Sequence, residues 1–398
     1  MKRTLTHSAL DPAFGHEGLA VLPHDMTQAT GMAMQDDNTL LIAGAAQKGS
    51  FMVARVLDTG HLDTRFGEQG VIRSEFEPGQ SAVAVEVFAV PGDKTLVIYN
   101  TTMLNRPGIT PVIARYHNDG RLDLSYGVDG TCPLHYPLDH QMKASSAAPS
   151  GQTTLTQNGE VLTSWWYPYY GKTVTYRIDQ NGRLDPTFNQ TGYAFLPSSL
   201  GSSAVWATVL LASGNTLLAG VFLNQTGGGI PFLVRYTTSG IPDPMFGDNG
   251  IVFLNRYAGG RYTHWLETPD NRIVGFGQNA DKGSSLIALQ GDGRTDPAFI
   301  APPVSDVWQW TSGTYGRSKL TAVGHTANPH DLVIARHLAD GALDPDFGDG
   351  TGWVRLDISM SDESDLPFTV QAACDALLVS GITTQGGISC GFVAKVRS

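Results

Sequence analysis

Cysteine and charge are both scarce in this sequence. Cys132, Cys374 and Cys390 are the only cysteines in 398 residues, and an odd number leaves at least one thiol unpaired. The chain is therefore not a small scaffold held together by disulfide bonds. Charged residues make up 16% of the chain, a fraction that disfavours helical bundles and coiled coils. Hydrophobic residues make up 41%, which is ample for a packed core and excludes a disordered chain.

Positive charge is the second shortage. The 37 Asp and Glu residues outnumber the 26 Lys and Arg residues, and the net charge is −11 at pH 7. The cationic residues are scattered singly and form no basic cluster in the sequence. Because an acidic surface repels a phosphate backbone, we expect no nucleic-acid partner.

Long apolar runs are also missing. No stretch of about 18 apolar residues occurs, and we therefore expect no membrane span. The N-terminus carries two basic residues without an apolar run behind them, which is unlike a signal peptide. The expected compartment is the cytoplasm by default, with leaderless secretion or surface association as alternatives. The sequence carries no signal for an oligomeric state.

What the sequence does contain is an internal repeat. The hexamer at residues 10–15, LDPAFG, recurs six more times as an aspartate followed three residues later by Phe or Tyr. The copies are separated by 48 residues (Asp296 to Asp344) to 62 residues (Asp123 to Asp185). Self-similarity at such a period indicates a repeat architecture. The motif aspartates are Asp11, Asp63, Asp123, Asp185, Asp243, Asp296 and Asp344.

Four strands are predicted around each copy of the motif. An apolar run precedes it, as at residues 51–56 or 111–116, and a second apolar run lies upstream, as at 39–44 or 95–100. A weaker alternating run, such as 84–90, comes before these two, and a short strand follows the motif. Four strands in up-and-down order are the content of one β-propeller blade. A β-solenoid is the alternative, but its repeats are usually shorter.

The two ends of the chain complement each other. The sequence ends at residues 391–398 on a run that in every other copy leads into the motif, and it begins with the motif itself. A strand at about 18–23 should therefore complete the blade whose first three strands lie at about 368–398. We predict an all-β, seven-bladed β-propeller with four antiparallel strands per blade, forming a single domain over residues 1–398 and closed by its own ends.

The recurring motif residues are expected to be structural. Calcium is the functional alternative, but most copies offer only one or two carboxylates and a calcium loop needs about six or more ligands. We expect the aspartate to cap a tight turn and the aromatic ring to fill the gap between blades. A cation also recurs before the motif, at Arg55, Arg115, Arg177, Arg235, Arg336 and Lys395, with Leu289 as the exception. We predict that these cations pair with motif aspartates.

The motif as a whole resembles the delta-60 repeat family of bacterial β-propeller repeats. Residues 119–130, with Asp123, Tyr126 and Gly130, form the copy most similar to that pattern, whereas Asn189 and Ile300 replace its glycine. The resemblance covers essentially the whole chain. It implies a propeller, often within large bacterial surface or secreted proteins, and no defined reaction.

Catalytic motifs are missing from the sequence. It has no HExxH, CxxC, P-loop or dinucleotide fingerprint, and the GxSxG match at residues 387–391 lies too close to the end for a hydrolase elbow. The histidines show no metal-ligand spacing. We therefore predict no catalytic residue, no metal and no cofactor, and favour a non-catalytic protein over an enzyme.

Aromatic residues are concentrated in the middle repeats, in segments expected near the face formed by the loops that join blades. Flat rings suit the C–H faces of sugars and also suit protein contacts; the alternative is that they pack between blades or fill the channel. The candidate binding residues are Trp165, Trp166, Tyr167, Tyr169, Tyr170, Trp206, Tyr262, His264, Trp265, Trp308 and Trp310.

Three functions remain open from the sequence. The first is a non-catalytic module that binds a glycan or a protein surface through this aromatic face. The second is a glycoside hydrolase or lyase with a site in the central funnel. Such an enzyme needs paired carboxylates, and Glu267 and Asp306 are the candidates for them. The third is a structural scaffold. The long connection at 132–154 and the acidic segment at 357–365 are further candidates for partner contact.

Overall fold

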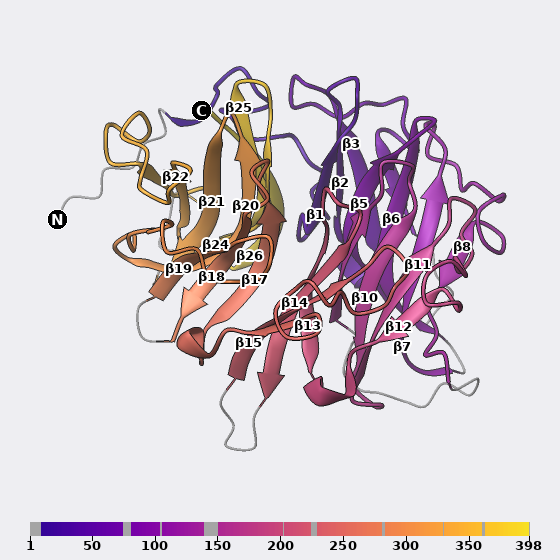
Figure 1. Ribbon diagram of the computed structural model, residues 1–398. Coiled ribbons are helices and arrows are strands. Elements are labelled where there is room, and N and C mark those ends of the chain that lie inside the picture. The colour runs from indigo at the N-terminus through magenta and orange to yellow at the C-terminus, as the bar shows by residue number, and fades with distance from the viewer. Residues whose placement is uncertain are drawn as a thin grey trace.

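Seven antiparallel sheets arranged in a ring make up the protein (Figure 1). The computed structural model describes residues 9–74, 81–103, 106–138, 150–201, 203–223, 229–280, 283–328, 330–359 and 363–397. Helices are confined in these residues to short 3-10 turns, and none is long and apolar enough to cross a membrane. The predicted all-β, seven-bladed propeller is confirmed.

The strands follow one another through the blades in chain order. Blade one holds β1 (Gly31–Met34), β2 (Leu40–Ala45), β3 (Phe51–Val56) and β4 (Val71–Arg73). Blade two holds β5 (Ser81–Val90), β6 (Lys94–Met103), β7 (Arg106–Tyr116) and β8 (Thr131–Pro133). Blade three holds β9 (Ser150–Leu155), β10 (Val161–Tyr167), β11 (Lys172–Ile178) and β12 (Tyr193–Phe195). Blade four holds β13 (Ala204–Leu210), β14 (Thr216–Leu223), β15 (Gly229–Tyr236) and β16 (Ile251–Phe253).

The last three blades complete the ring. Blade five holds β17 (Arg261–Glu267), β18 (Ile273–Asn279) and β19 (Gly283–Leu289). Blade six holds β20 (Val307–Gly316), β21 (Lys319–Thr326), β22 (Leu332–His337) and β23 (Trp353–Leu356). Blade seven holds β24 (Asp365–Ala372), β25 (Ala376–Gln385) and β26 (Ile388–Arg397). The 3-10 turns are η2 (Gln47–Gly49), η3 (Ser198–Leu200) and η4 (Asn255–Tyr257).

The N-terminal segment closes blade seven as predicted. Leu19 forms an antiparallel bridge with Ala394 of β26, and the Ala20 amide donates to the Val393 carbonyl at 2.9 Å. Blade five differs in its outer part, where three strands are hydrogen bonded in the described residues. Pro302 and Pro303 follow its motif and lack the amide hydrogens that a fourth strand would donate.

The core lies between adjacent blades. The second and third strands are buried on both faces, so that β3 carries six buried residues in a row. Between blades six and seven, for example, Val323 and Leu332 share one apolar cluster with Leu377 and Phe392. The seven motif rings, from Phe14 onward, are at most 9% exposed and pack in these gaps. This confirms the predicted role of the motif aromatic residue.

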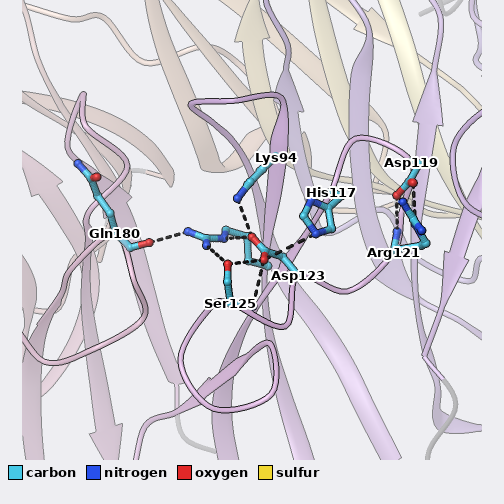
Figure 2. Close-up of polar contacts among 8 residues, drawn as sticks. Lys94, His117, Asp119, Arg121, Asp123, Ser125 and Gln180 are labelled. Carbon is cyan, nitrogen blue, oxygen red and sulfur yellow. Dashed lines mark hydrogen bonds and ion pairs between the residues drawn. The ribbon is translucent and has the colours of Figure 1, made fainter.

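The motif aspartate anchors a network that links neighbouring blades. In blade two the Arg115 Nε donates to the Asp123 Oδ2 at 2.7 Å, and its guanidinium lies 4.6 Å from the centre of the Tyr126 ring. The Arg115 Nη1 also donates to the Gln180 carbonyl of blade three, and Figure 2 shows Lys94 approaching Asp123 from another side. The motif turn therefore fastens its own blade to the next one.

The predicted pairing of cation and aspartate is confirmed, each within one copy of the repeat. The other pairs are Arg55 with Asp63, Arg177 with Asp185, Arg235 with Asp243, Arg336 with Asp344 and Lys395 with Asp11. Arg or Lys side chains are paired with these carboxylates, which supports a structural role over a calcium site at the motif.

Blade five has no cation at the position where the other blades carry one. The residue at that position is Ala288, one residue before the predicted Leu289. The Asp296 amide donates to the Ala288 carbonyl, as the Asp63 amide does to the Arg55 carbonyl, so Ala288 rather than Leu289 stands at the cation position. Arg272 supplies the missing charge from just before β18, with its Nε 2.7 Å from the Asp296 Oδ2. The charge has moved to the adjacent strand while the ion pair is retained.

Candidate functional site

A cavity of 510 Å³ lies on the axis of the ring. Residues from all seven innermost strands or the segments that lead into them line it, namely β1, β5, β9, β13, β17, β20 and β24. Its volume is within the range of pockets that hold small molecules, about 300–1,000 Å³. The axis is therefore the place where the seven blades can act on one ligand.

β-Bulges in the innermost strands shape this cavity. In β13 the pairing with β14 shifts between Val205 and Ala207, which leaves Trp206 as the extra residue. The same shift leaves Thr263 extra in β17 and Phe368 extra in β24, and all three residues line the cavity. A bulge re-aims side chains relative to the regular pleat, so these strands present residues that strict alternation would not.

Glycine on the second strand makes room for the bulge. A Cβ atom at Gly277 would lie 2.0 Å from the Arg261 carbonyl oxygen, and one at Gly220 would lie 2.1 Å from the Ala204 carbonyl oxygen. Both contacts are shorter than any real Cβ contact, so the backbone of the innermost strand approaches too closely for any other residue.

A ring of polar side chains lines the cavity at one level. Its members occupy the same register position in their blades, opposite Ile98, Ser164, Phe276, Val323 and Ser380 of the second strands. These residues are Glu86, Gln152, His264, Ser312 and Thr369. The ring combines one carboxylate, one imidazole, one amide and two hydroxyls, which together can donate and accept hydrogen bonds around a polar ligand.

Glu86 is the carboxylate of this ring. Its Oε1 accepts a hydrogen bond from the Thr153 amide of blade three at 3.2 Å, while its Oε2 is buried and has no hydrogen-bond partner among the described residues. Burial raises the pKa of Glu86 to about 7. The side chain therefore exchanges its proton near neutral pH.

His264 lies on the same ring and stays neutral at physiological pH. Burial lowers its pKa to about 4, against the opposing effect of a hydrogen bond with the Gly313 backbone of blade six. Its ring packs edge-on against Phe276, with 5.7 Å between the ring centres. A neutral imidazole can donate through one nitrogen and accept through the other.

Trp206 and Arg261 add a flat ring and a positive charge to the cavity. The Arg261 guanidinium carbon lies 4.9 Å from the centre of the Trp206 ring, across the gap between blades four and five. Both residues line the cavity, Trp206 half-buried and Arg261 exposed. A guanidinium held over an indole is fixed in orientation by the ring.

Comparison with known proteins agrees with the fold and goes no further. No protein-family model and no curated protein matches the chain. The BP39L lectin from Burkholderia pseudomallei superposes with a TM-score of 0.50 at 10% identity, covering 94% of this chain and 97% of the lectin. At such low identity the likeness shows the propeller fold alone.

Two enzymes with propeller folds are also similar in structure. The PQQ-bound aldose sugar dehydrogenase from Streptomyces coelicolor gives a TM-score of 0.44 at 14% identity, covering 95% of this chain and 98% of that enzyme. The GH43 endo-arabinanase from Bacillus licheniformis gives 0.34 at 11% identity, with 69% and 99% covered. Similar structures therefore include both a lectin and enzymes, and the fold does not choose between them.

Five of the predicted binding residues belong to the core. Trp165, Tyr167, Tyr262, Trp265 and Trp310 are at most 6% exposed. Polar atoms of these rings bond within the protein, since the Trp165 Nε1 donates to the Thr163 Oγ1 at 2.7 Å and the Tyr167 hydroxyl to the Leu134 carbonyl at 2.8 Å. These rings pack between blades, and their burial corrects the prediction that they form part of a binding face.

The other six predicted residues divide among four places. Trp206 and His264 line the axial cavity. Tyr169, 52% exposed, and Tyr170 lie on the β10–β11 loop, where Tyr170 stacks on Tyr136 with 3.8 Å between ring centres. Trp166 is half-buried on β10, and Trp308 at the start of β20 is 51% exposed. The structure thus forms no single aromatic face.

Sequence reasoning missed Glu86, Arg261 and Phe368. Glu86 left one signal, because it is the only charged residue in the apolar run 84–90. Phe368 reaches the cavity through a bulge, which the sequence pattern does not reveal. The nominees Glu267 and Asp306 are not among the residues that line the cavity, and residues 139–149 of the long connection lie outside the described residues.

Proposed function

We propose that the protein is a non-catalytic binding module that holds a small polar ligand, a sugar, in the cavity on the ring axis. One observation carries the proposal. The Trp206 indole, with the Arg261 guanidinium over it, lines the same cavity as the polar side chains of Glu86 and His264. The motif also supports membership of the delta-60 repeat family, which stays a prediction.

The chemistry of the lining matches that of a sugar. A pyranose has an apolar C–H face that suits an indole ring, and hydroxyl groups that need donors and acceptors around its rim. Glu86 places a carboxyl group in the lining, and Arg261 offers several donors in one plane. Neutral His264 offers either function.

A glycoside hydrolase is less well supported by this lining. Such enzymes use two carboxyl groups about 5–10 Å apart, one as acid and one as base or nucleophile. Among the described residues, Glu86 is the one carboxylate that lines the cavity. A single carboxylate can orient a sugar hydroxyl but does not supply this pair of roles.

The test is a glycan-array screen with the purified protein, followed by calorimetry on each hit. Trp206→Ala should weaken binding about tenfold or more, because an aromatic anchor is removed from the ligand contact. Trp166→Ala is the matched control, since it removes another half-buried tryptophan that does not line the cavity.

Three results would contradict the proposal. The array can give no hit, or Trp166→Ala can abolish binding while Trp206→Ala does not. The third is turnover, because release of a shortened sugar from a hit would make the protein an enzyme rather than a binding module.

A further inference from the structure

Arg261 is the one Lys or Arg side chain among the described residues that line the axial cavity. It begins β17, where it lies opposite Gln278, whereas His264 of the polar ring lies opposite Phe276. The two side chains are therefore two ladder positions apart, about 7 Å along the strand. Arg261 is exposed, so the positive charge of the cavity is at its solvent end.

The guanidinium of Arg261 has no acidic partner in the described part of the chain. Eleven other arginines form ion pairs with Asp or Glu there. Arg261 instead contacts the face of the Trp206 ring. Because that ring offers no oxygen acceptor, the N–H donors of Arg261 remain available to the oxygens of a ligand.

The carboxyl group of the lining does not cancel this charge. Glu86 belongs to blade two and Arg261 to blade five, three places apart in a ring of seven, so the two side chains line the cavity from opposite sides of the axis. Burial raises the pKa of Glu86 to about 7 and lowers that of His264 to about 4. Between these pH values both side chains are mainly neutral, and the lining carries one net positive charge.

A cavity of this charge favours an anionic ligand, although the chain as a whole is acidic, with a net charge of −11. The N–H donors of a guanidinium lie in one plane and match the two oxygens of a carboxylate. Among sugars, the uronic acids carry such a group on the same pyranose ring whose C–H face suits an indole. The lining thus offers a partner for each part of a uronic acid.

We propose that the ligand of the axial cavity is an acidic sugar, a uronic acid, whose carboxylate binds to Arg261. This inference rests on the proposed function, that the cavity holds a sugar, and narrows it to sugars with a carboxylate. The sugar ring contacts Trp206, and its hydroxyls reach the polar side chains of Glu86 and His264 further along the axis. The carboxylate stays at the solvent end of the cavity.

The first experiment uses the full-length chain and a glycan array that carries oligosaccharides of glucuronate, galacturonate and mannuronate, each beside its methyl ester. The ester keeps the sugar ring and removes the negative charge. At pH 6 we expect an acid to bind about fivefold or more tightly than its ester, because a hydrogen bond between charged groups is stronger than a neutral one. The preference should shrink in about 0.5 M NaCl, because salt screens exposed charges.

The array separates failure of this inference from failure of the proposed function. Neutral sugars that bind as tightly as their acids, or more tightly, would overturn the inference and leave the sugar-binding module standing. Hits confined to sulfated sugars would exclude the carboxylate as the recognised group. An array without any hit would contradict the binding module itself.

The second experiment asks whether Arg261 provides the preference for the acid. Arg261→Gln keeps a hydrogen-bond donor and removes the charge, and it should weaken binding of the acid about fivefold more than binding of the ester. Arg256→Gln is the matched control, because Arg256 is exposed, lies five residues earlier and is not among the residues that line the cavity. It makes the same change in net charge and should leave the ratio of the two affinities at its wild-type value.

Two results of this comparison would remove Arg261 from the site. In the first, Arg261→Gln leaves the ratio of acid to ester affinity unchanged. In the second, Arg256→Gln lowers the ratio as much as Arg261→Gln does, which would assign the preference to the overall charge of the protein rather than to the cavity.

Discussion

Replacing Arg272 by alanine should lower the free energy of unfolding by about 3–5 kcal/mol, because it leaves a buried carboxylate without its counter-charge. The partner, Asp296, is 8% exposed and lies 2.7 Å from the Arg272 Nε. The same substitution also removes the hydrogen bond from Arg272 to the Ala339 carbonyl of blade six. Urea-induced unfolding followed by tryptophan fluorescence measures the loss.

The matched control lies in the same blade. Arg294 pairs with Asp292 at 2.6 Å, but its side chain is 80% exposed. An exposed pair of this kind contributes about 0–1 kcal/mol, so Arg294→Ala should shift the urea midpoint little. If the two arginines prove equally dispensable, the motif ion pair is not a stabilising element of the blade.

A second substitution tests whether the stability of blade five depends on having a cation beside Asp296, whichever strand supplies that cation. Adding Ala288→Arg to Arg272→Ala moves the cation to the place where other blades carry it, and we expect this to recover most of the lost stability. Blade seven already has this arrangement, with Ala376 at the position of Arg272 and Lys395 paired with Asp11. Failure to recover would mean that the space around Ala288 has closed.

Replacing Glu86 by glutamine should change how stability depends on pH. The pKa of Glu86 rises from its ordinary value of 4.5 to about 7 in the folded chain. Between these two values the folded chain therefore holds a proton that the unfolded chain has released. The free energy of unfolding then falls as the pH rises through this window and stays lower above it.

The magnitude follows from the size of the shift. Ionising this buried carboxyl above pH 7 costs on the order of 3 kcal/mol. Glu86→Gln removes that cost, so the variant should be more stable than the wild type at pH 8 and equal to it at pH 4. Urea midpoints at pH 4, 6 and 8 measure the effect, and exposed Glu68→Gln should follow the wild type. A variant with the wild-type pH slope would show that Glu86 does not titrate in this window.

The repeat made most of the fold predictable. An aspartate and an aromatic residue at a fixed spacing recur because each blade needs the same turn and the same ring between blades, as Asp123 and Tyr126 illustrate. The closure by the N-terminal segment was predictable for the same reason. Alignment by apolar runs alone failed at Ala288, whereas the constant distance of eight residues from cation to aspartate would have located it.

The axial site was less accessible to sequence reasoning. Aromatic composition does not separate Trp165, which lies in the core, from Trp206, which lines the cavity. Trp165 lies on β10, the second strand of its blade, whereas Trp206 lies on the innermost strand β13 at a bulge, a local change of register that no residue pattern predicts. Glu86 was similarly hidden, because the register that places it opposite Ile98 depends on the bulge before it.

The links between motif turns have a consequence for how this ring can vary. Arg55, Arg115 and Arg177 each donate to a carbonyl of the following blade, so the motif turns join neighbouring blades along one rim of the ring. Five repeats keep eight residues from cation to aspartate, while the spacing between successive motif aspartates varies by up to 14 residues, 62 against 48. We therefore expect insertions to be tolerated best away from these linked turns, so that new binding properties can arise at the other rim without loosening the ring.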